Sequence, residues 1–65
     1  MSNEEIRARF NTYYEREPVD YLKIGAMIGL DTKQRRYLLS RFANGKNLNI
    51  NTLTAISEFL KVRGY

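Results

Sequence analysis

The chain has 65 residues, no cysteine and no histidine, and its formal net charge at pH 7 is +4. A chain this short folds as one domain, residues 1–65, with little room for an enclosed active site beside its core. The missing residue types exclude disulfides, thiolate zinc sites and the commonest general base. No apolar run approaches the roughly 18 residues of a membrane span, and the N-terminus has no signal-peptide pattern. We therefore expect a cytoplasmic, non-enzymatic protein with no cofactor, no metal and no membrane partner.

Charge is unevenly divided along the chain. Residues 1–31 contain four basic and six acidic side chains, whereas residues 32–65 contain seven basic side chains and a single acidic one, Glu58. A basic half on a small domain indicates a polyanionic partner such as nucleic acid. The acidic residues of the first half are interleaved with arginines, which is typical of solvated helix faces rather than of a catalytic or metal-binding cluster.

The first predicted helix begins at Asn3 and ends near Glu17. Ser2 and Glu5 have the spacing of a capping box, and Pro18 disfavours helical backbone in the residue before it. Apolar side chains recur at helical spacing and form a core-facing stripe: Ile6, Phe10, Tyr13 and Tyr14. The two tyrosines could instead form a base-stacking platform, but core packing with hydroxyls at the rim is the favoured interpretation.

The second predicted helix opens at Val19 or Asp20. The helix should run to about Ile28, and its apolar positions are Leu22, Ile24, Met27 and Ile28. Gly25 inside this helix costs up to about 1 kcal/mol relative to alanine, so we expect another helix to approach closely there. Gly29 suits the positive φ of a sharp turn, and Leu30 is expected to turn inward.

Residues 31–46 predict a third helix with one apolar and one basic face. The apolar side is formed by Leu38, Leu39 and Phe42. The opposite side and its flanks carry basic and hydrogen-bonding side chains: Lys33, Gln34, Arg36, Tyr37, Ser40 and Arg41. Asn44 and Gly45 both tolerate left-handed backbone and are expected to end the helix. Such a helix has the size and chemistry to enter a DNA major groove, although it could also be an ordinary basic surface helix.

The last predicted helix runs from about Asn51 to Val62, after a loop at residues 46–49. Either Asn49 or Asn51 can cap it, and its core stripe is Leu53, Ile56 and Leu60. A second apolar patch lies to one side of this stripe and is expected to be partly exposed in a monomer: Phe59, Val62 and Tyr65. We interpret this patch as a homodimer contact. The alternative is a wide core stripe that closes over the first helix.

Three segments together resemble the Cro and phage-repressor-like helix-turn-helix family. Residues 24–30, IGAMIGL, resemble that family's first helix and turn, and residues 39–46, LSRFANGK, resemble the end of its recognition helix. Residues 50–60, INTLTAISEFL, are similar to the helix that follows. The resemblance implies an all-α, lambda-repressor-like domain of four or five helices, with the helix-turn-helix at about residues 20–43.

One departure from the family concerns the spacing between Gly29 and Asn44. This spacing is longer than the family's usual one by about four residues, which is close to one helical turn. One interpretation starts the recognition helix a turn early, at Thr32, with Asp31 as its N-cap. The alternative is a longer turn, with the helix beginning near residues 35–36. The two interpretations differ in which side chains reach the bases.

The resemblance implies a sequence-specific regulator of transcription that binds double-stranded DNA. We expect a bacterial or phage repressor of the Cro type, acting as a homodimer on an inverted repeat, with helix 32–43 in the major groove. Base contacts are expected from Lys33, Gln34, Arg36, Tyr37 and Ser40, with Thr32 in the same DNA-binding set. Phosphate contacts are expected from Arg41, Asn44, Lys46 and, on the second helix, Lys23. The alternatives are a protein-interaction module, such as an antirepressor or antitoxin, and a DNA-bending, excisionase-like protein; an antirepressor could also be its partner.

Overall fold

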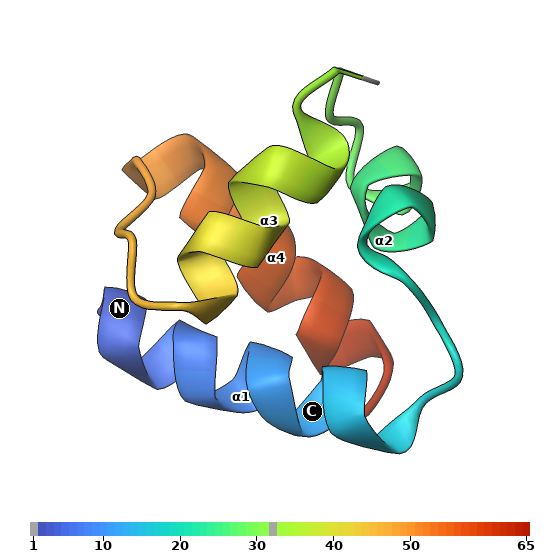
Figure 1. Ribbon diagram of the computed structural model, residues 1–65. Helices are drawn as coiled ribbons and strands as arrows, with labels where there is room; N and C mark the ends of the chain where they lie inside the picture. Colours follow the sequence, from blue (N-terminus) through green and yellow to red (C-terminus); the bar gives the residue numbers. More distant parts are fainter. Residues whose placement is uncertain (1, 32) are drawn as a thin grey trace.

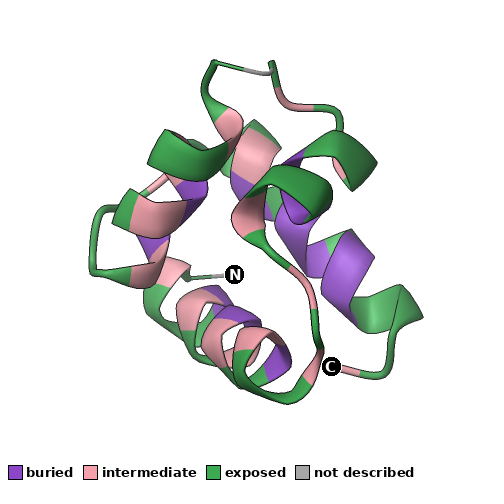
Figure 2. Cartoon of the chain, turned by 45° about the vertical axis from the view of Figure 1, so that its right-hand side comes forward, coloured by how far each residue is buried: buried purple, intermediate pink, exposed green. Residues whose placement is uncertain are grey.

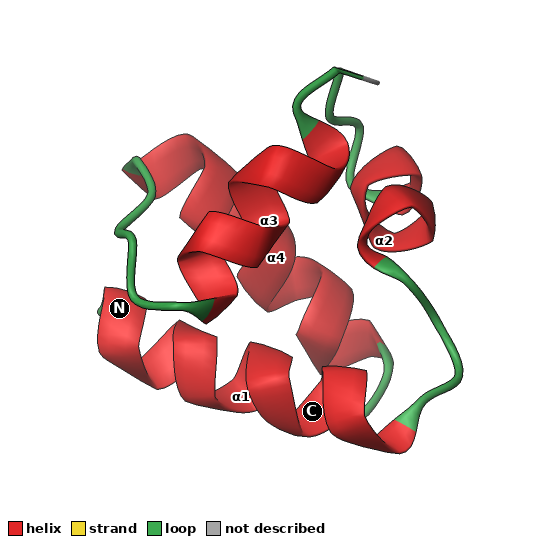
Figure 3. Ribbon diagram, viewed as in Figure 1, coloured by secondary structure: helices red, strands yellow, loops and turns green. Residues whose placement is uncertain are grey.

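Four α-helices, joined by loops and turns, build the described part of the chain: α1 (Asn3–Arg16), α2 (Tyr21–Met27), α3 (Arg35–Ala43) and α4 (Ile50–Val62) (Figure 1). The computed structural model describes residues 2–31 and 33–65, and within these ranges there is no strand (Figure 3). None of these four helices is long and apolar enough to cross a membrane. The predicted all-α class is therefore confirmed as a small domain of four helices.

Short-range capping signals in the sequence set most of the helix starts. Three helices follow a residue whose side-chain oxygen accepts a hydrogen bond from a nearby backbone N–H: Ser2 from Glu5 at 3.1 Å, Asp20 from Lys23 at 2.8 Å, and Asn49 from Thr52 at 3.0 Å. Each cap pairs a backbone donor that the first helical turn leaves unsatisfied, and is worth about 1 kcal/mol. The predicted cap at Ser2 is confirmed, and Asn49 rather than Asn51 caps α4; Asp20, one of the two residues at which the second helix was expected to open, is the cap of α2. At the other end of α1, Glu17 is extended ahead of Pro18, as expected.

The start of α3 differs from the first interpretation of the sequence. The helix begins at Arg35, and Gln34 before it makes no side-chain capping bond. Asp31 Oδ1 accepts a hydrogen bond from the backbone N–H of Lys33 at 3.0 Å, two residues on, and not from that of Gln34. This is the local turn that aspartate forms in competition with a helix cap. The early start at Thr32 is therefore wrong, and the longer turn is confirmed; Thr32 itself lies outside the described residues.

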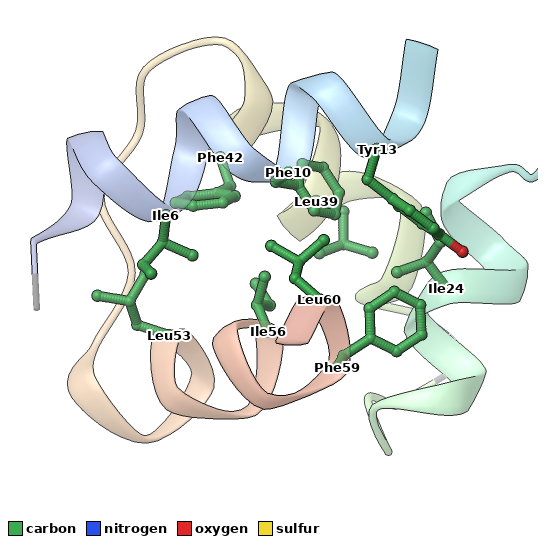
Figure 4. Close-up of a cluster of buried hydrophobic side chains, with 10 residues drawn as sticks. All are labelled: Ile6, Phe10, Tyr13, Ile24, Leu39, Phe42, Leu53, Ile56, Phe59 and Leu60. Atoms are coloured by element: carbon green, nitrogen blue, oxygen red, sulfur yellow. The ribbon is translucent and has the colours of Figure 1, made fainter. Parts of the chain in front are cut away.

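One face of each helix contributes to the core, and α1 and α4 lie on opposite sides of it (Figure 4). The buried side chains are Ile6, Phe10, Tyr13, Ile24, Leu39, Phe42, Leu53, Ile56, Phe59 and Leu60. The rings of Phe10 and Phe42 meet edge to face, with centroids 5.6 Å apart. Tyr14 is half-buried and stacks on Tyr21 at 4.3 Å. Both tyrosines of α1 are thus used within the fold, as the favoured interpretation expected.

Helix α2 leaves part of its apolar surface exposed. Ile24 is fully buried, but Leu22 and Met27 are 38% and 46% exposed. A helix this short has only about two turns, and it packs mainly against α3. Leu30, after the positive-φ turn at Gly29, is half-buried against the core, which confirms the predicted inward turn.

The apolar patch predicted at the C-terminus is mostly part of the core. Phe59 is only 7% exposed, and its ring packs edge-on against Tyr13 with centroids 5.4 Å apart. Tyr65 is half-buried, 5.2 Å from the same tyrosine ring. Val62 alone remains open, at 81% exposure. The expectation of partial exposure is therefore wrong for Phe59, and the alternative of a wide stripe closing over α1 is confirmed for Phe59 and for the buried part of Tyr65.

The chain turns back after α4, and this turn brings Tyr65 into contact with α1. Gly64 has φ +83°, a left-handed conformation that reverses the chain direction. Arg9 of α1 then donates from Nε to the Tyr65 carbonyl at 2.8 Å and from Nη1 to the Ser57 hydroxyl at 3.2 Å. The Tyr65 hydroxyl donates to the Glu17 carboxylate at 3.0 Å. Tyr65 is therefore tied to the middle of α1 through Arg9 and to its C-terminal end through Glu17, by polar contacts that the apolar pattern does not contain.

Candidate nucleic-acid interface

Helix α3 has the two predicted faces. Leu39 and Phe42 are fully buried, whereas the basic and polar residues on the other side and at both ends are exposed: Lys33, Gln34, Arg36, Tyr37, Arg41, Asn44 and Lys46. Ser40 is half-buried. Figure 2 shows the same division, with exposed residues on the outer sides of the helices and buried residues gathered between them. We call the exposed residues Arg36, Tyr37, Arg41, Asn44 and Lys46 the basic face.

The C-terminal end of α3 is fixed by side chains of α1. Arg7 donates from Nε to the Phe42 carbonyl at 2.6 Å and from Nη2 to Asn47 Oδ1 at 2.9 Å. Its guanidinium also lies 5.0 Å from the centre of the Phe42 ring. Asn11 donates to the Ala43 carbonyl at 3.3 Å. These contacts give side-chain donors to two carbonyls of the last turn, although that of Phe42 also accepts from the Gly45 backbone N–H at 3.1 Å, and they place a positive charge at the negative end of the helix dipole.

Contacts with α2 and with the connection between the two helices fix the N-terminal end of α3. A Cβ built on Gly25 would lie 2.5 Å from Arg35 Cγ, so the predicted close approach at this glycine is confirmed. The Leu30 backbone N–H donates to the Gly25 carbonyl at 2.9 Å, and Arg35 Nε donates to the Leu30 carbonyl at 2.8 Å. Arg35 thus packs its aliphatic stem on α2 and uses its head to hold the connection between the two helices.

Two members of the basic face already contact each other. Arg41 Nη1 donates to the Tyr37 hydroxyl at 3.1 Å, and the guanidinium carbon lies 5.2 Å from the centre of the Tyr37 ring. Both contacts fall within the ranges of a hydrogen bond and a cation–π interaction. Tyr37 is nevertheless 61% exposed. The pair therefore stands on the outer surface with its polar groups accessible.

A shallow hollow lies beside this pair, lined by Arg41, Asn44 and Lys46. The Asn44 side-chain nitrogen donates to the Ser40 carbonyl at 2.7 Å, which holds the amide against the end of the helix. Gly45 has φ +114° and ends α3 as predicted. The hollow is open and bordered by two positive charges, which suits a solvent-exposed anionic group better than an enclosed substrate.

The structure divides the predicted DNA-binding set into three groups. Arg36, Tyr37, Ser40 and Arg41 lie on α3, with Asn44 and Lys46 just beyond its end. Lys33 and Gln34 lie in the connection before α3, because the helix begins later than the first interpretation assumed. Lys23 is exposed in the first turn of α2.

Sequence analysis missed two supporting residues, Arg7 and Arg35. Their supporting roles depend on which backbone carbonyls lie opposite them, and the sequence alone does not show these. Gly25 did signal that a neighbour approaches α2, but the glycine could not identify Arg35 as that neighbour.

Shifted pKa values occur away from the basic face. Burial, followed by the neighbouring Tyr14, raises the pKa of Tyr21. The hydrogen bond to Glu17 is the first cause of the raised pKa of Tyr65. Both phenols therefore remain protonated at neutral pH. Across residues 2–31 and 33–65, no group of three acidic side chains is placed to hold a metal ion.

No protein-family model, curated protein or solved structure matches this chain. The basis for a functional assignment is therefore the surface itself, together with the sequence resemblance. Its main physical features are the cationic side chains of α3 and the contacts that fix both ends of that helix.

Proposed function

We propose that this protein is a sequence-specific regulator of transcription that binds double-stranded DNA, with α2 and α3 as a helix-turn-helix and α3 as the recognition helix. The observation that carries the proposal is the basic face of α3: its side chains are exposed while the opposite face is buried and both helix ends are held by arginines. A helix fixed in this way can insert into a major groove without first becoming ordered.

The first turn of α3 is the best-placed segment for base contacts. A recognition helix reads base edges mainly from its N-terminal residues, and here these include Arg36. Arginine can pair with both O6 and N7 of guanine, which discriminates against other bases by about 1–3 kcal/mol. Lys33 and Gln34 would approach DNA from the connection before α3 rather than from its first turn.

The other end of the basic face suits the DNA backbone. Arg41 and Lys46 border the hollow and carry positive charge to the C-terminal side of α3. Contacts of this kind fix the register of a protein on DNA and make its affinity fall with salt. The strongly basic composition of residues 32–65 adds a long-range attraction to DNA.

Pairing of two copies on an inverted repeat remains part of the proposal, as expected for a Cro-type repressor. Phe59 and Tyr65 do not support it, because their rings are used within the chain. A dimer would have to use other exposed apolar side chains, such as Val62 or Ile50.

A protein-interaction module of the antirepressor or antitoxin kind is the second candidate. The exposed side chains of Leu22 and Met27 on α2 favour it, because apolar groups on the surface of a small domain can serve as contacts for another protein. Such binding would depend little on salt, in contrast to DNA binding.

An in vitro selection from random duplex DNA at about 150 mM salt tests the proposal, because phosphate-only binding is weak under those conditions. The proposal expects an enriched inverted repeat, whose half-site spacing reports the distance between two recognition helices. One enriched half-site would support a monomer. Salt-sensitive binding without enrichment would favour the DNA-bending, excisionase-like alternative, and no binding would favour a protein partner.

A matched pair of charge removals makes this test specific to α3. Arg36→Ala removes a charge from the basic face, whereas Lys61→Ala removes one from the exposed side of α4. The proposal expects the enriched sequence to change or vanish with Arg36→Ala and to persist with Lys61→Ala. The same loss in both variants would show that only total charge matters.

A further inference from the structure

The contact between Tyr37 and Arg41 restrains a side chain that is normally mobile. An exposed arginine has four rotatable side-chain bonds and loses much rotamer freedom when it binds a ligand. Here the guanidinium is held from two directions, by the Tyr37 hydroxyl at 3.1 Å and by the ring face at 5.2 Å. The two residues are one helical turn apart on α3, so the helix itself sets their separation.

The restrained guanidinium still has most of its hydrogen-bonding capacity. An arginine has five N–H donors, and the bond to Tyr37 uses one of them. The remaining donors include an edge that can pair with two oxygens of one phosphate group. Arg41 also lines the shallow hollow with Lys46, so a phosphate placed there would meet two positive charges.

We propose that Tyr37 is a positioning residue that orients Arg41 toward a backbone phosphate of the bound DNA, and does not itself read a base. This inference rests on the proposed DNA-binding function and refines it, because the sequence had placed Tyr37 in the base-reading set. The phenol oxygen accepts from Arg41, and the ring lies along the guanidinium. Tyr37 then contributes to affinity by removing a conformational cost, equally for every DNA sequence.

The inference predicts a graded loss of affinity across variants. Tyr37→Phe keeps the ring but removes the hydrogen bond, and should weaken binding by about threefold. Tyr37→Ala removes both contacts and should weaken it by about tenfold. Each loss should be the same on the selected site and on random duplex DNA, because a phosphate contact carries no sequence information. Arg41→Ala should in addition reduce the salt slope by about 0.9, the value for one phosphate.

A double-mutant cycle between Tyr37→Ala and Arg41→Ala is the deciding experiment. If Tyr37 acts through Arg41, the double variant binds no worse than Arg41→Ala alone, on both kinds of DNA. A second cycle, between Tyr37→Ala and Lys46→Ala, serves as the control and should be additive. Additivity in the first cycle would overturn the inference. A Tyr37→Ala loss confined to the selected site would also overturn it, because that result would show a direct base contact.

Measurements on the free protein separate this inference from folding and from the proposed function. Because Tyr37 is exposed, all variants should keep wild-type helicity by circular dichroism. NMR relaxation of the Arg41 side-chain Nε–H group should show restricted motion in the wild type and free motion in Tyr37→Ala. Free motion in the wild type would overturn the inference. If the wild type binds no DNA, the proposed function fails and the inference with it; if it binds and the first cycle is additive, only the inference fails.

Discussion

The arginines of α1 and those on the outer side of α3 have the same chemistry but opposite surroundings. Arg7 and Arg9 donate to backbone carbonyls of other segments at 2.6 and 2.8 Å and hold the fold together. Arg36 and Arg41 are exposed, and the side-chain contact shown for Arg41 is with its neighbour on the same helix. A count of positive charges along the chain treats all four residues alike. Only the second pair is available to a partner.

The comparison extends to the helices that carry these residues. The α1–α4 pair supplies most of the buried core, with aromatic contacts such as that between Tyr13 and Phe59. The α2–α3 pair meets through a glycine and the stem of Arg35, and much of its surface is left to solvent. We infer that the first pair mainly supplies stability and that the second pair is shaped for binding. Variants that separate these two roles are the means to test this division.

The largest effect is expected from a charge placed in the α1–α4 contact. Phe59→Glu removes a buried ring and buries a carboxylate without a partner, which should cost at least about 3 kcal/mol and unfold a domain of this size. The matched variant Val62→Glu lies on an exposed position of the same helix and should change stability by no more than about 0.5 kcal/mol. Urea unfolding followed by circular dichroism measures both. If the Phe59→Glu variant stays folded but binds DNA more weakly, the result would instead support Phe59 as a dimer contact.

The next largest effects are expected when one arginine of each group is replaced by alanine. Arg7→Ala leaves the Phe42 carbonyl without its side-chain donor and should lower the free energy of unfolding by about 1–3 kcal/mol. Arg36→Ala should leave that free energy within about 0.5 kcal/mol of wild type and weaken binding to the selected DNA site by about 1–3 kcal/mol. Thermal unfolding and fluorescence anisotropy measure the two quantities.

The control for this pair is binding to random duplex DNA. Arg36→Ala should weaken that binding much less than binding to the selected site, since the proposal gives Arg36 a base contact. An equal loss on both DNAs would assign Arg36 to a phosphate. A stability loss in Arg36→Ala as large as that in Arg7→Ala would contradict the division between the two groups of arginines.

A smaller effect is expected where α2 meets α3. Gly25→Ala adds helix propensity worth about 1 kcal/mol but places a methyl group against the Arg35 stem, so the net result should be a loss of about 1 kcal/mol. In an Arg35→Ala background Cγ is absent but the Cβ of residue 35 remains, 2.6 Å from the added methyl group, so the same substitution should still destabilise the protein, by less than in the wild type. Chemical denaturation of the four proteins gives the comparison. A gain from Gly25→Ala in the wild-type background would show that the close approach is not limiting.

These predictions also show which parts of the structure could be predicted from sequence. Helix caps at Ser2 and Asn49 could be predicted because each side chain has one nearby set of backbone donors. Asp31 has two such choices, a turn or a cap, and the contact of Arg35 with Gly25 lies beyond the local sequence. The boundary of α3 therefore needed the three-dimensional structure.

The same limit applies to the surfaces. The exposed basic side of α3 could be predicted, since the helical period separates Arg36 and Arg41 from Leu39 and Phe42. Phe59 was misplaced because its burial depends on the aromatic packing of α1, which the period of α4 does not contain. Binding of DNA by the basic face remains a prediction.

The smallest expected effect concerns the alkaline limit of stability, in the α1–α4 region alone. The pKa of Tyr65 is raised above its ordinary value, first by its hydrogen bond to Glu17. The folded state therefore favours the protonated phenol, so the contribution of this group is complete below the ordinary pKa and is lost as pH rises through the raised one. Tyr65→Phe cannot ionise and should lose less stability between about pH 9 and about pH 11 than the wild type. The difference between the two proteins in urea unfolding isolates Tyr65, because every other side chain is the same in both. DNA binding at neutral pH should be the same in both proteins. If the free energy of unfolding changes with pH in the same way in both, the contact of Tyr65 with Glu17 of α1 does not contribute to stability.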